Sequence, residues 1–136
     1  MEIHVREHDR EIDASLIAED AETIRKQVRE YDAGERETFT LEIAYPETFT
    51  GEVMRAMIDI PYGETRTYGD LAADLDTAAV AVGQACSRNP IPVIVPCHRV
   101  VGADSLTGYG GGLELKRQLL ALEGAAVVSS PSPDSQ

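Results

Sequence analysis

The feature that most constrains the fold is an apolar stretch at residues 91–102, IPVIVPCHRVVG, which carries reactive side chains at its centre. Its valines and isoleucines are typical of a buried segment. Pro96 has no backbone donor, however, and is unfavourable in a regular central strand. Neighbouring residues of a strand also face opposite ways, whereas a turn could bring Cys97 and His98 together. We therefore expect a buried turn here, with the rest of the chain folded around it.

The centre of this stretch has the composition of a nucleophilic site. A cysteine attacks as its thiolate, and a neighbouring base or cation favours that form; His98 and Arg99 follow Cys97 directly. A third group must orient the imidazole, and Glu123, which follows the leucines of an apolar helix, could be drawn inward to do so. The alternatives stay open here. Buried cysteines are more often inert core residues, and glutamates near helix ends are more often solvated.

Hydrophobic periodicity predicts a chain that is mainly helical. Alternating apolar and polar residues predict one strand, over residues 39–45, which Pro46 ends. Helical spacing predicts a helix over residues 18–31, and Thr48 or Thr50 could cap the next helix. The remaining predicted helices cover residues 68–75, 78–87 and 113–124, the last one stopped by Gly124.

These elements predict an α+β chain with one main domain. The expected parts are a small αβ region at residues 1–46, a helical domain at residues 47–126 and a disordered tail at residues 127–136. The predicted helices over residues 68–75 and 78–87 are separated by so few residues that they have the form of a helix-turn-helix.

Acidic residues dominate the chain but are unevenly distributed. It has 24 Asp and Glu against 12 Lys and Arg, and a net charge of −12. Such an excess is typical of proteins from a salt-rich cytoplasm, although an ordinary acidic protein that avoids polyanions would have it too. No Asp or Glu occurs in residues 77–103. A surface that approaches phosphates would be cleared of carboxylates in this way, and so would a segment that is simply buried.

The sequence predicts a cytoplasmic protein without a membrane partner, metal or cofactor. No apolar run is long enough to span a bilayer, and the polar N-terminus does not resemble a signal peptide. Cys86 and Cys97 are too few for a disulfide framework, so we expect two free thiols. His4 and His8 have helical spacing but no third ligand beside them, so we expect no metal site there.

The central stretch resembles the active-site signature of the DNA-protein cysteine methyltransferases, which repair O-6-alkylguanine. The residues that carry the resemblance are PCHRV, the preceding RNP and the following LTGYGGGLELKRQLLALEG. It extends back through IPYGETRTYGDLAADL and so covers residues 49–125. The fold that it implies is a winged-helix-like alkyltransferase domain with a helix-turn-helix, while the N-terminal region resembles the family's smaller domain only loosely.

The resemblance implies that Cys97 takes the alkyl group of O-6-methylguanine irreversibly, once per molecule and without a cofactor. The damaged guanine would be flipped out of the DNA stack to reach the sulfur. His98, through a water, would take the thiol proton, with support from Glu123. The other implied roles are these: Asn89 orders the segment, Tyr68 hydrogen-bonds or protonates the departing base, and Val100, Tyr109, Gly110 and Gly111 bind the base.

The resemblance also implies that a monomer binds double-stranded DNA through the minor groove, with the second helix of the pair facing the duplex. The implied DNA-facing residues are Val80, Val82, Gly83, Ala85 and Arg88. Gly83 would permit close approach of the strand. Val80 stands where the family usually has an arginine that fills the space left by the flipped base, so this chain would use an apolar wedge.

Two other classes of function are compatible with parts of the sequence. A non-catalytic lesion-binding protein would flag alkylated DNA for another pathway. The non-catalytic relatives of the family replace the cysteine, however, and this chain keeps Cys97, which favours the enzyme. A plain winged-helix regulator would leave the PCHR segment unexplained.

Overall fold

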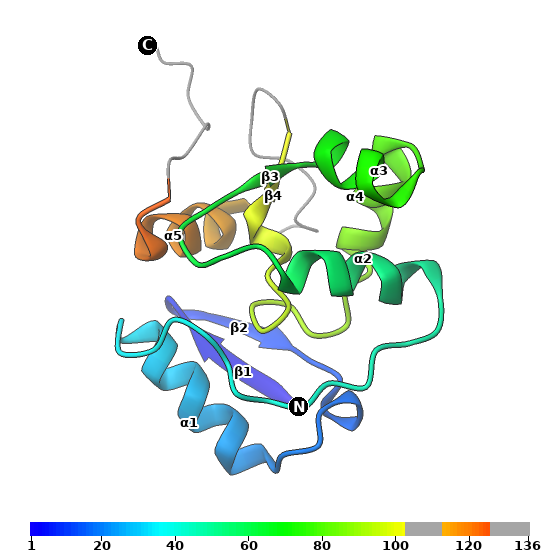
Figure 1. The fold of residues 1–136 in the computed structure, drawn as a ribbon. Coiled ribbons are helices and arrows are strands. Elements are labelled where there is room, and N and C mark those ends of the chain that lie inside the picture. The colour runs from blue at the N-terminus through cyan, green and yellow to red at the C-terminus, as the bar shows by residue number, and fades with distance from the viewer. Residues whose placement is uncertain (103–112, 126–136) are drawn as a thin grey trace, which may run out of the picture.

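The computed structural model describes residues 1–102 and 113–125, and its fold is α+β. An N-terminal unit of one hairpin and one helix lies against a larger helical region, as Figure 1 shows. The predicted base-binding residues Tyr109, Gly110 and Gly111, and the predicted tail at residues 127–136, lie outside the described residues.

The N-terminal unit begins with a hairpin that the sequence analysis did not predict. Strand β1 (Glu2–Val5) pairs antiparallel with β2 (His8–Glu11), and the two residues of the turn, Arg6 and Glu7, both have positive φ. Two positive φ angles give a tight turn whose twist matches that of the strands. The hairpin is hard to recognise because nearly every residue on its outer face is charged.

Helix α1 (Ala21–Asp32) confirms the helix predicted over residues 18–31. The carboxylate of Asp20 caps it by accepting a hydrogen bond from the amide of Thr23 at 2.8 Å. Its buried face consists of Ile24, Gln27, Val28 and Tyr31.

The strand predicted over residues 39–45 is wrong. Only Ile43 takes part in a β-bridge there, with Ile17. The chain opposite it is mostly a 3₁₀ turn, η1 (Ala14–Leu16), and the extended backbone at Ile17 is too short to form a ladder with the segment.

Three helices of the main region match their predictions. Helix α2 (Phe49–Ile58) begins after Thr48, whose hydroxyl accepts from the amide of Gly51 at 3.2 Å. Helix α3 (Tyr68–Leu75) begins with a capping box, and α4 (Ala79–Ser87) follows after three residues. Asp76 ends α3 in the left-handed conformation, which turns the chain sharply into α4.

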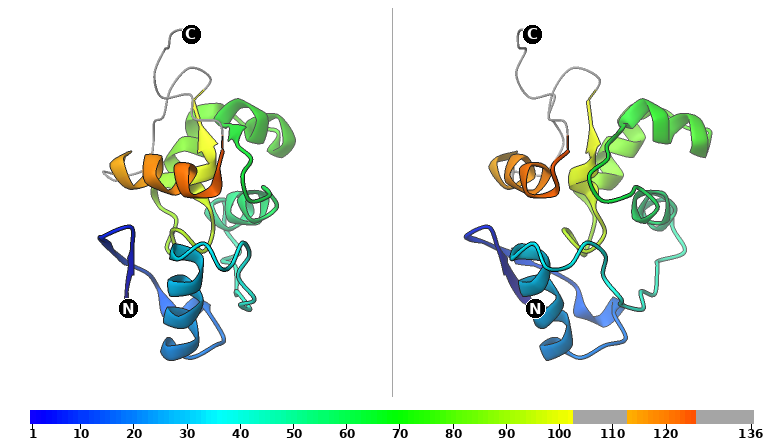
Figure 2. Two further views of the ribbon diagram at one scale, coloured as in Figure 1. Left: turned by 90° about the vertical axis from the view of Figure 1, so that its left-hand side faces the viewer. Right: turned by 60° about the vertical axis from the view of Figure 1, so that its left-hand side comes forward.

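The central apolar stretch forms the expected buried turn. Residues Cys97–Arg99 are a 3₁₀ helix, η2, followed by β4 (Val100–Val101), which pairs parallel with β3 (Arg66–Thr67). Helix α5 (Leu113–Glu123) ends at Gly124, which has φ +73°. The turn η2 contacts both α5 and α2 and lies between them in Figure 2. No helix of the described residues is long and apolar enough to cross a membrane.

Candidate active site

The side chains of η2 are withdrawn from solvent, and one of them, Cys97, borders a cavity. Cys97, His98 and Arg99 have exposed fractions of 3%, 0% and 7%. A cavity of about 220 Å³ lies against Cys97. The described residues that line it are Arg10, Glu11, Cys86, Ser87, Asn89, Pro92 and Cys97. The sulfur therefore borders a space that lies between the N-terminal hairpin, the end of α4 and the loop before η2.

Glu123 reaches the turn from the last residue of α5 and accepts hydrogen bonds from two of its side chains. Its Oε2 lies 2.8 Å from Nε2 of His98. Arg99 donates from Nε to Oε1 at 2.8 Å and from Nη2 to Oε2 at 2.9 Å, so the guanidinium binds the carboxylate at both oxygens. The structure thus brings the side chains of His98 and Glu123 together, which the spacing of these residues in the sequence alone could not establish, and it places Cys97 next to His98 on the same turn.

The carboxylate of Glu123 is ionised in this setting. Burial by itself would raise its pKa, but the hydrogen bonds from His98 and Arg99 outweigh that effect and lower the pKa to about 2. An ionised carboxylate only accepts hydrogen bonds, so Nε2 of His98 must carry the proton of the neutral ring.

His98 is therefore set up as a base at its other nitrogen. Burial lowers the pKa of the imidazole, against the opposing effect of Glu123, so the ring is neutral near neutral pH. With Nε2 protonated, Nδ1 is the acceptor. This atom is buried and has no hydrogen-bond partner among the described residues. A buried acceptor without a partner is costly, and a water bound there would satisfy it.

Asn89 holds the loop that leads into the turn. Its Nδ2 donates to the carbonyl of Val95 at 3.0 Å, and its Oδ1 accepts from the amide of Ile91 at 3.1 Å. Within the loop, Val93 has φ 75°, a conformation that is strained for a β-branched residue. The two bonds of Asn89 help to hold this strained loop and so fix the position of Cys97.

Lys116 is a site residue that the sequence analysis missed. It is fully buried, and its Nζ donates to the carbonyl of Val100 at 2.7 Å and to the hydroxyl of Tyr68 at 3.3 Å. Burial lowers the pKa of its ammonium group to about 8. The spacing of Lys116 from Leu119, Leu120 and Glu123, all on one face of α5, was the signal that could have revealed it.

The predicted DNA-facing residues divide between the surface and the core. Val80, near the start of α4, is 69% exposed, and Arg88, which follows the helix, is also exposed. Val82 and Ala85 are buried, so the prediction that they face DNA is corrected: their side chains pack in the core. Because nearly all of α4 is apolar or small, its periodicity does not distinguish the two faces.

Gly83 lies on α4 without an internal packing reason for being glycine. A Cβ added there would meet only Cδ1 of Tyr68, at 4.0 Å, which is ordinary contact. Glycine inside a helix costs about 1 kcal/mol relative to alanine. No packing contact among the described residues requires a glycine at this position, so packing does not account for the destabilisation.

Comparisons with known proteins identify relatives for most of the chain. The family model described as "6-O-methylguanine DNA methyltransferase, DNA binding domain" matches residues 48–125. A methylated-DNA–protein-cysteine methyltransferase of Methanosarcina acetivorans is 50% identical over 104 residues, which are 74% of this chain and 67% of the relative. The protein of the same name from Mycobacterium tuberculosis is 52% identical over 101 residues, 71% of this chain and 61% of the relative. The chain thus spans about two thirds of these relatives or less.

A solved structure of similar fold comes from the same organism. The Mycobacterium tuberculosis protein OGT in complex with DNA has a TM-score of 0.72 and 48% sequence identity. The match covers 76% of this chain and 66% of that one.

Proposed function

The chain belongs to the 6-O-methylguanine DNA methyltransferase family, and from that membership we propose that it repairs DNA by transferring the alkyl group of O-6-methylguanine to its own Cys97. Residues 47–126 would carry DNA binding and transfer, and residues 1–46 would form the small N-terminal region. The observation that carries this proposal is the arrangement at η2: a cysteine at a cavity, followed by an imidazole that Glu123 holds through Nε2 and whose Nδ1 is left to accept a proton.

The proposed transfer conserves atoms and charge, and it uses the side chains of Cys97, His98 and Tyr68. His98 takes the thiol proton at Nδ1 through a water, and the sulfur of Cys97 attacks the alkyl carbon. The S–C bond forms as the C–O bond to guanine breaks, and the bond electrons pass to the purine ring. Tyr68 donates a proton to the departing base and regains one from His98 through solvent. The net change converts a thiol and methylguanine into a thioether and guanine.

Each molecule would act once. Returning the sulfur to its free state requires another nucleophile to remove the alkyl group from a thioether, which is a very poor leaving group. The second thiol near the cavity does not serve that purpose, because burial raises the pKa of Cys86 to about 12 and keeps it protonated. We therefore expect one alkyl group per protein molecule.

The pair α3 and α4 is the proposed helix-turn-helix, with α4 facing the minor groove of the duplex. Two observations support this assignment: the absence of Asp and Glu from residues 77–103, and Gly83, whose missing side chain would let a DNA strand approach closely. Val80 would insert as an apolar wedge when the damaged base flips out, because it is large, apolar and exposed. We propose that the protein acts as a monomer, in a salt-rich cytoplasm.

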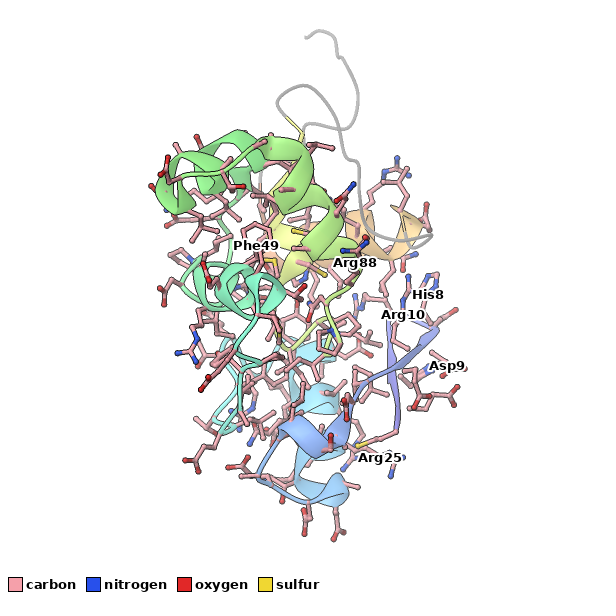
Figure 3. The ribbon with its side chains drawn as sticks, turned by 90° about the vertical axis from the view of Figure 1, so that its right-hand side faces the viewer. His8, Asp9, Arg10, Arg25, Phe49 and Arg88 are labelled. Atoms are coloured by element: carbon pink, nitrogen blue, oxygen red, sulfur yellow. The ribbon has the colours of Figure 1, made fainter. Side chains whose placement is uncertain are left out.

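Arg88 and Arg10 would contact phosphates beside the lesion. They lie near one another in Figure 3, and Arg10 lines the cysteine cavity together with Ser87 and Asn89, the neighbours of Arg88. Two guanidinium groups at this edge would favour binding of a polyanion by a strongly acidic protein, even though the carboxylate of Glu11 lines the same cavity.

The test is a mass measurement on the protein after incubation with an oligonucleotide that contains O-6-methylguanine. The peptide with Cys97 should gain one methylene mass, while the peptide with Cys86 in the same digest should not change. An oligonucleotide with ordinary guanine is the control and should leave both peptides unmodified. Tight lesion binding with no gain of mass would instead support the alternative function, a protein that flags damage without removing it.

A further inference from the structure

The carboxylate of Glu123 accepts a hydrogen bond from the N-terminal unit as well as from the turn. Tyr31, on α1, donates its hydroxyl proton to Oε2 of Glu123 at 2.6 Å, across 92 residues of sequence. Tyr31 is fully buried, and Glu123 is 6% exposed. A short hydrogen bond from a neutral donor to a buried carboxylate is one of the stronger polar contacts in a protein. The N-terminal unit therefore contacts the proposed proton relay directly.

Tyr31 and His98 use the same oxygen. Oε2 accepts from the Tyr31 hydroxyl, from Nε2 of His98 and from Nη2 of Arg99, whereas Oε1 accepts from Nε of Arg99 and weakly, at 3.4 Å, from the amide of Gly63. Donors on one oxygen share its negative charge. The hydrogen bond from Tyr31 to Oε2 therefore weakens the interaction of the same oxygen with the imidazole of His98.

We infer that Tyr31 is a positioning residue for alkyl transfer: its hydroxyl sets how strongly Glu123 holds His98, so that the N-terminal unit takes part in the reaction as well as supporting the fold. This inference rests on the proposed function, because it assigns Tyr31 a role in the relay that would activate Cys97.

The surroundings of Tyr31 fix its hydroxyl in place. Its ring packs against Phe39, with 5.3 Å between ring centroids, and edge-on against Tyr62 at 6.2 Å. Burial, with the nearby negative charge of Glu123, raises the pKa of the phenol well above its usual value, so the hydroxyl keeps its proton and remains a donor.

The charges around His98 determine the direction of the effect. Glu123 favours the imidazolium form, while Arg99 on the same turn and Lys116 from α5 oppose it. Tyr62 faces the same carboxylate. Removing the Tyr31 hydroxyl leaves more of the charge of Glu123 acting on His98, which raises the pKa of the imidazole. Protonated imidazole cannot accept the thiol proton, so the rate of transfer should fall at a higher pH than in the unaltered protein.

The test compares Tyr31→Phe with the unaltered protein. The rate constant for methyl transfer from an O-6-methylguanine oligonucleotide is measured against pH, and the acid side of the profile should move up by about one pH unit in the variant. The ring protons of His98, followed by NMR during a titration without DNA, should show a midpoint shifted the same way. This second readout does not depend on any transfer activity.

Tyr62→Phe is the matched control. Its hydroxyl donates to the carbonyl of Leu122 at 3.3 Å, and its ring touches that of Tyr31, so the substitution removes a hydroxyl from the same cluster but not from Glu123. Its pH profile should have the unshifted acid side of the unaltered protein.

Two results would overturn the inference. One is a Tyr31→Phe profile that coincides with that of the unaltered protein, and the other is a uniform loss of rate at every pH, which is what a purely structural tyrosine would give. If the unaltered protein transfers no methyl group, the proposed function fails, and the NMR midpoint of His98 still decides whether Tyr31 acts on the imidazole.

Discussion

His98 and Glu123 lie 2.8 Å apart, and neither side chain has any contact with solvent. The direction of this hydrogen bond is fixed, because the carboxylate is ionised and can only accept. The proton of the neutral imidazole is therefore on Nε2, and its basic nitrogen is Nδ1. Arg99 compensates the buried negative charge by binding both carboxylate oxygens. This relationship underlies the first two predictions.

Replacing the carboxylate with an amide should impair both transfer and stability. Glu123→Gln removes the charge that favours imidazolium and leaves the guanidinium of Arg99 buried without its counterion. We expect the rate of methyl transfer to fall by about 10²-fold and the free energy of unfolding to fall by about 3–5 kcal/mol. Rate measurements on folded protein and urea unfolding separate the two effects. Full activity in the variant would remove Glu123 from the relay.

The free energy of unfolding should fall as the solution becomes acidic. The pKa of His98 is lowered from 6.5 in the folded state by burial, and that of Glu123 is lowered from 4.5 to about 2 by the hydrogen bonds that outweigh its burial. The unfolded chain therefore binds more protons than the folded chain in acid, so stability is lost as the pH drops below 6.5, and further between 4.5 and about 2. Urea unfolding at neutral and acidic pH measures this, and Glu123→Gln should reduce the lower step, to which the lowered pKa values of Asp13, Asp20 and Glu30 also contribute. A flat profile would contradict the assigned shifts.

Removing the nucleophile should separate chemistry from recognition. Cys97→Ala should abolish methyl transfer and still bind an oligonucleotide with O-6-methylguanine, because only the sulfur is lost from a cavity that other residues also line. Transfer is followed by mass and binding by fluorescence anisotropy. Cys86→Ala, which removes the other buried thiol, should retain transfer. Methyl transfer by the Cys97 variant would refute the assignment.

Local signals in the sequence predicted most helices of the main region, and α3 spans the residues that were expected. These local signals failed where contacts between distant parts of the chain determine the secondary structure. The hairpin of β1 and β2 has one apolar face with only Ile3 and Val5 on the first strand, too short an alternation to recognise among charged residues. The predicted strand over residues 39–45 found almost no extended partner.

The candidate site likewise has a part that the sequence predicted and a part that depends on long-range contacts. That Glu123 would lie close to His98 was predictable, because Glu123 follows the leucines of α5 and could be drawn inward with them. The hydrogen bond from Tyr31 was not, because periodicity indicates only that this side chain faces inward and not which of the distant groups it meets. A contact across that separation depends on how α1 docks against the main region.

Arg88 should contribute to the salt dependence of DNA binding. Arg88→Gln should weaken binding to duplexes of any sequence and reduce the slope of log affinity against log salt by about one, as expected for a lost phosphate contact. Arg25→Gln is the matched control, because Arg25 is also exposed but lies at the far end of the N-terminal unit (Figure 3), and it should have no effect on the slope. The total slope should be shallow for a protein with a net charge of −12. A steep slope, or equal effects of the two variants, would contradict this interface.

Val80 provides the test of base flipping. An exposed valine near the start of α4 can hold a duplex open by filling the vacated space, but it cannot hydrogen-bond the unpaired cytosine. Val80→Arg adds donors and a positive charge, so the rate of repair in duplex DNA should rise, whereas the reaction with free O-6-methylguanine base should change little because nothing is flipped. Val80→Ala, which shortens the wedge, should lower duplex repair and also leave the free-base reaction nearly unchanged. The measurement is the ratio of the two rate constants in each protein. If that ratio stays constant across the three, Val80 does not enter the duplex and α4 must present another residue to the damaged pair.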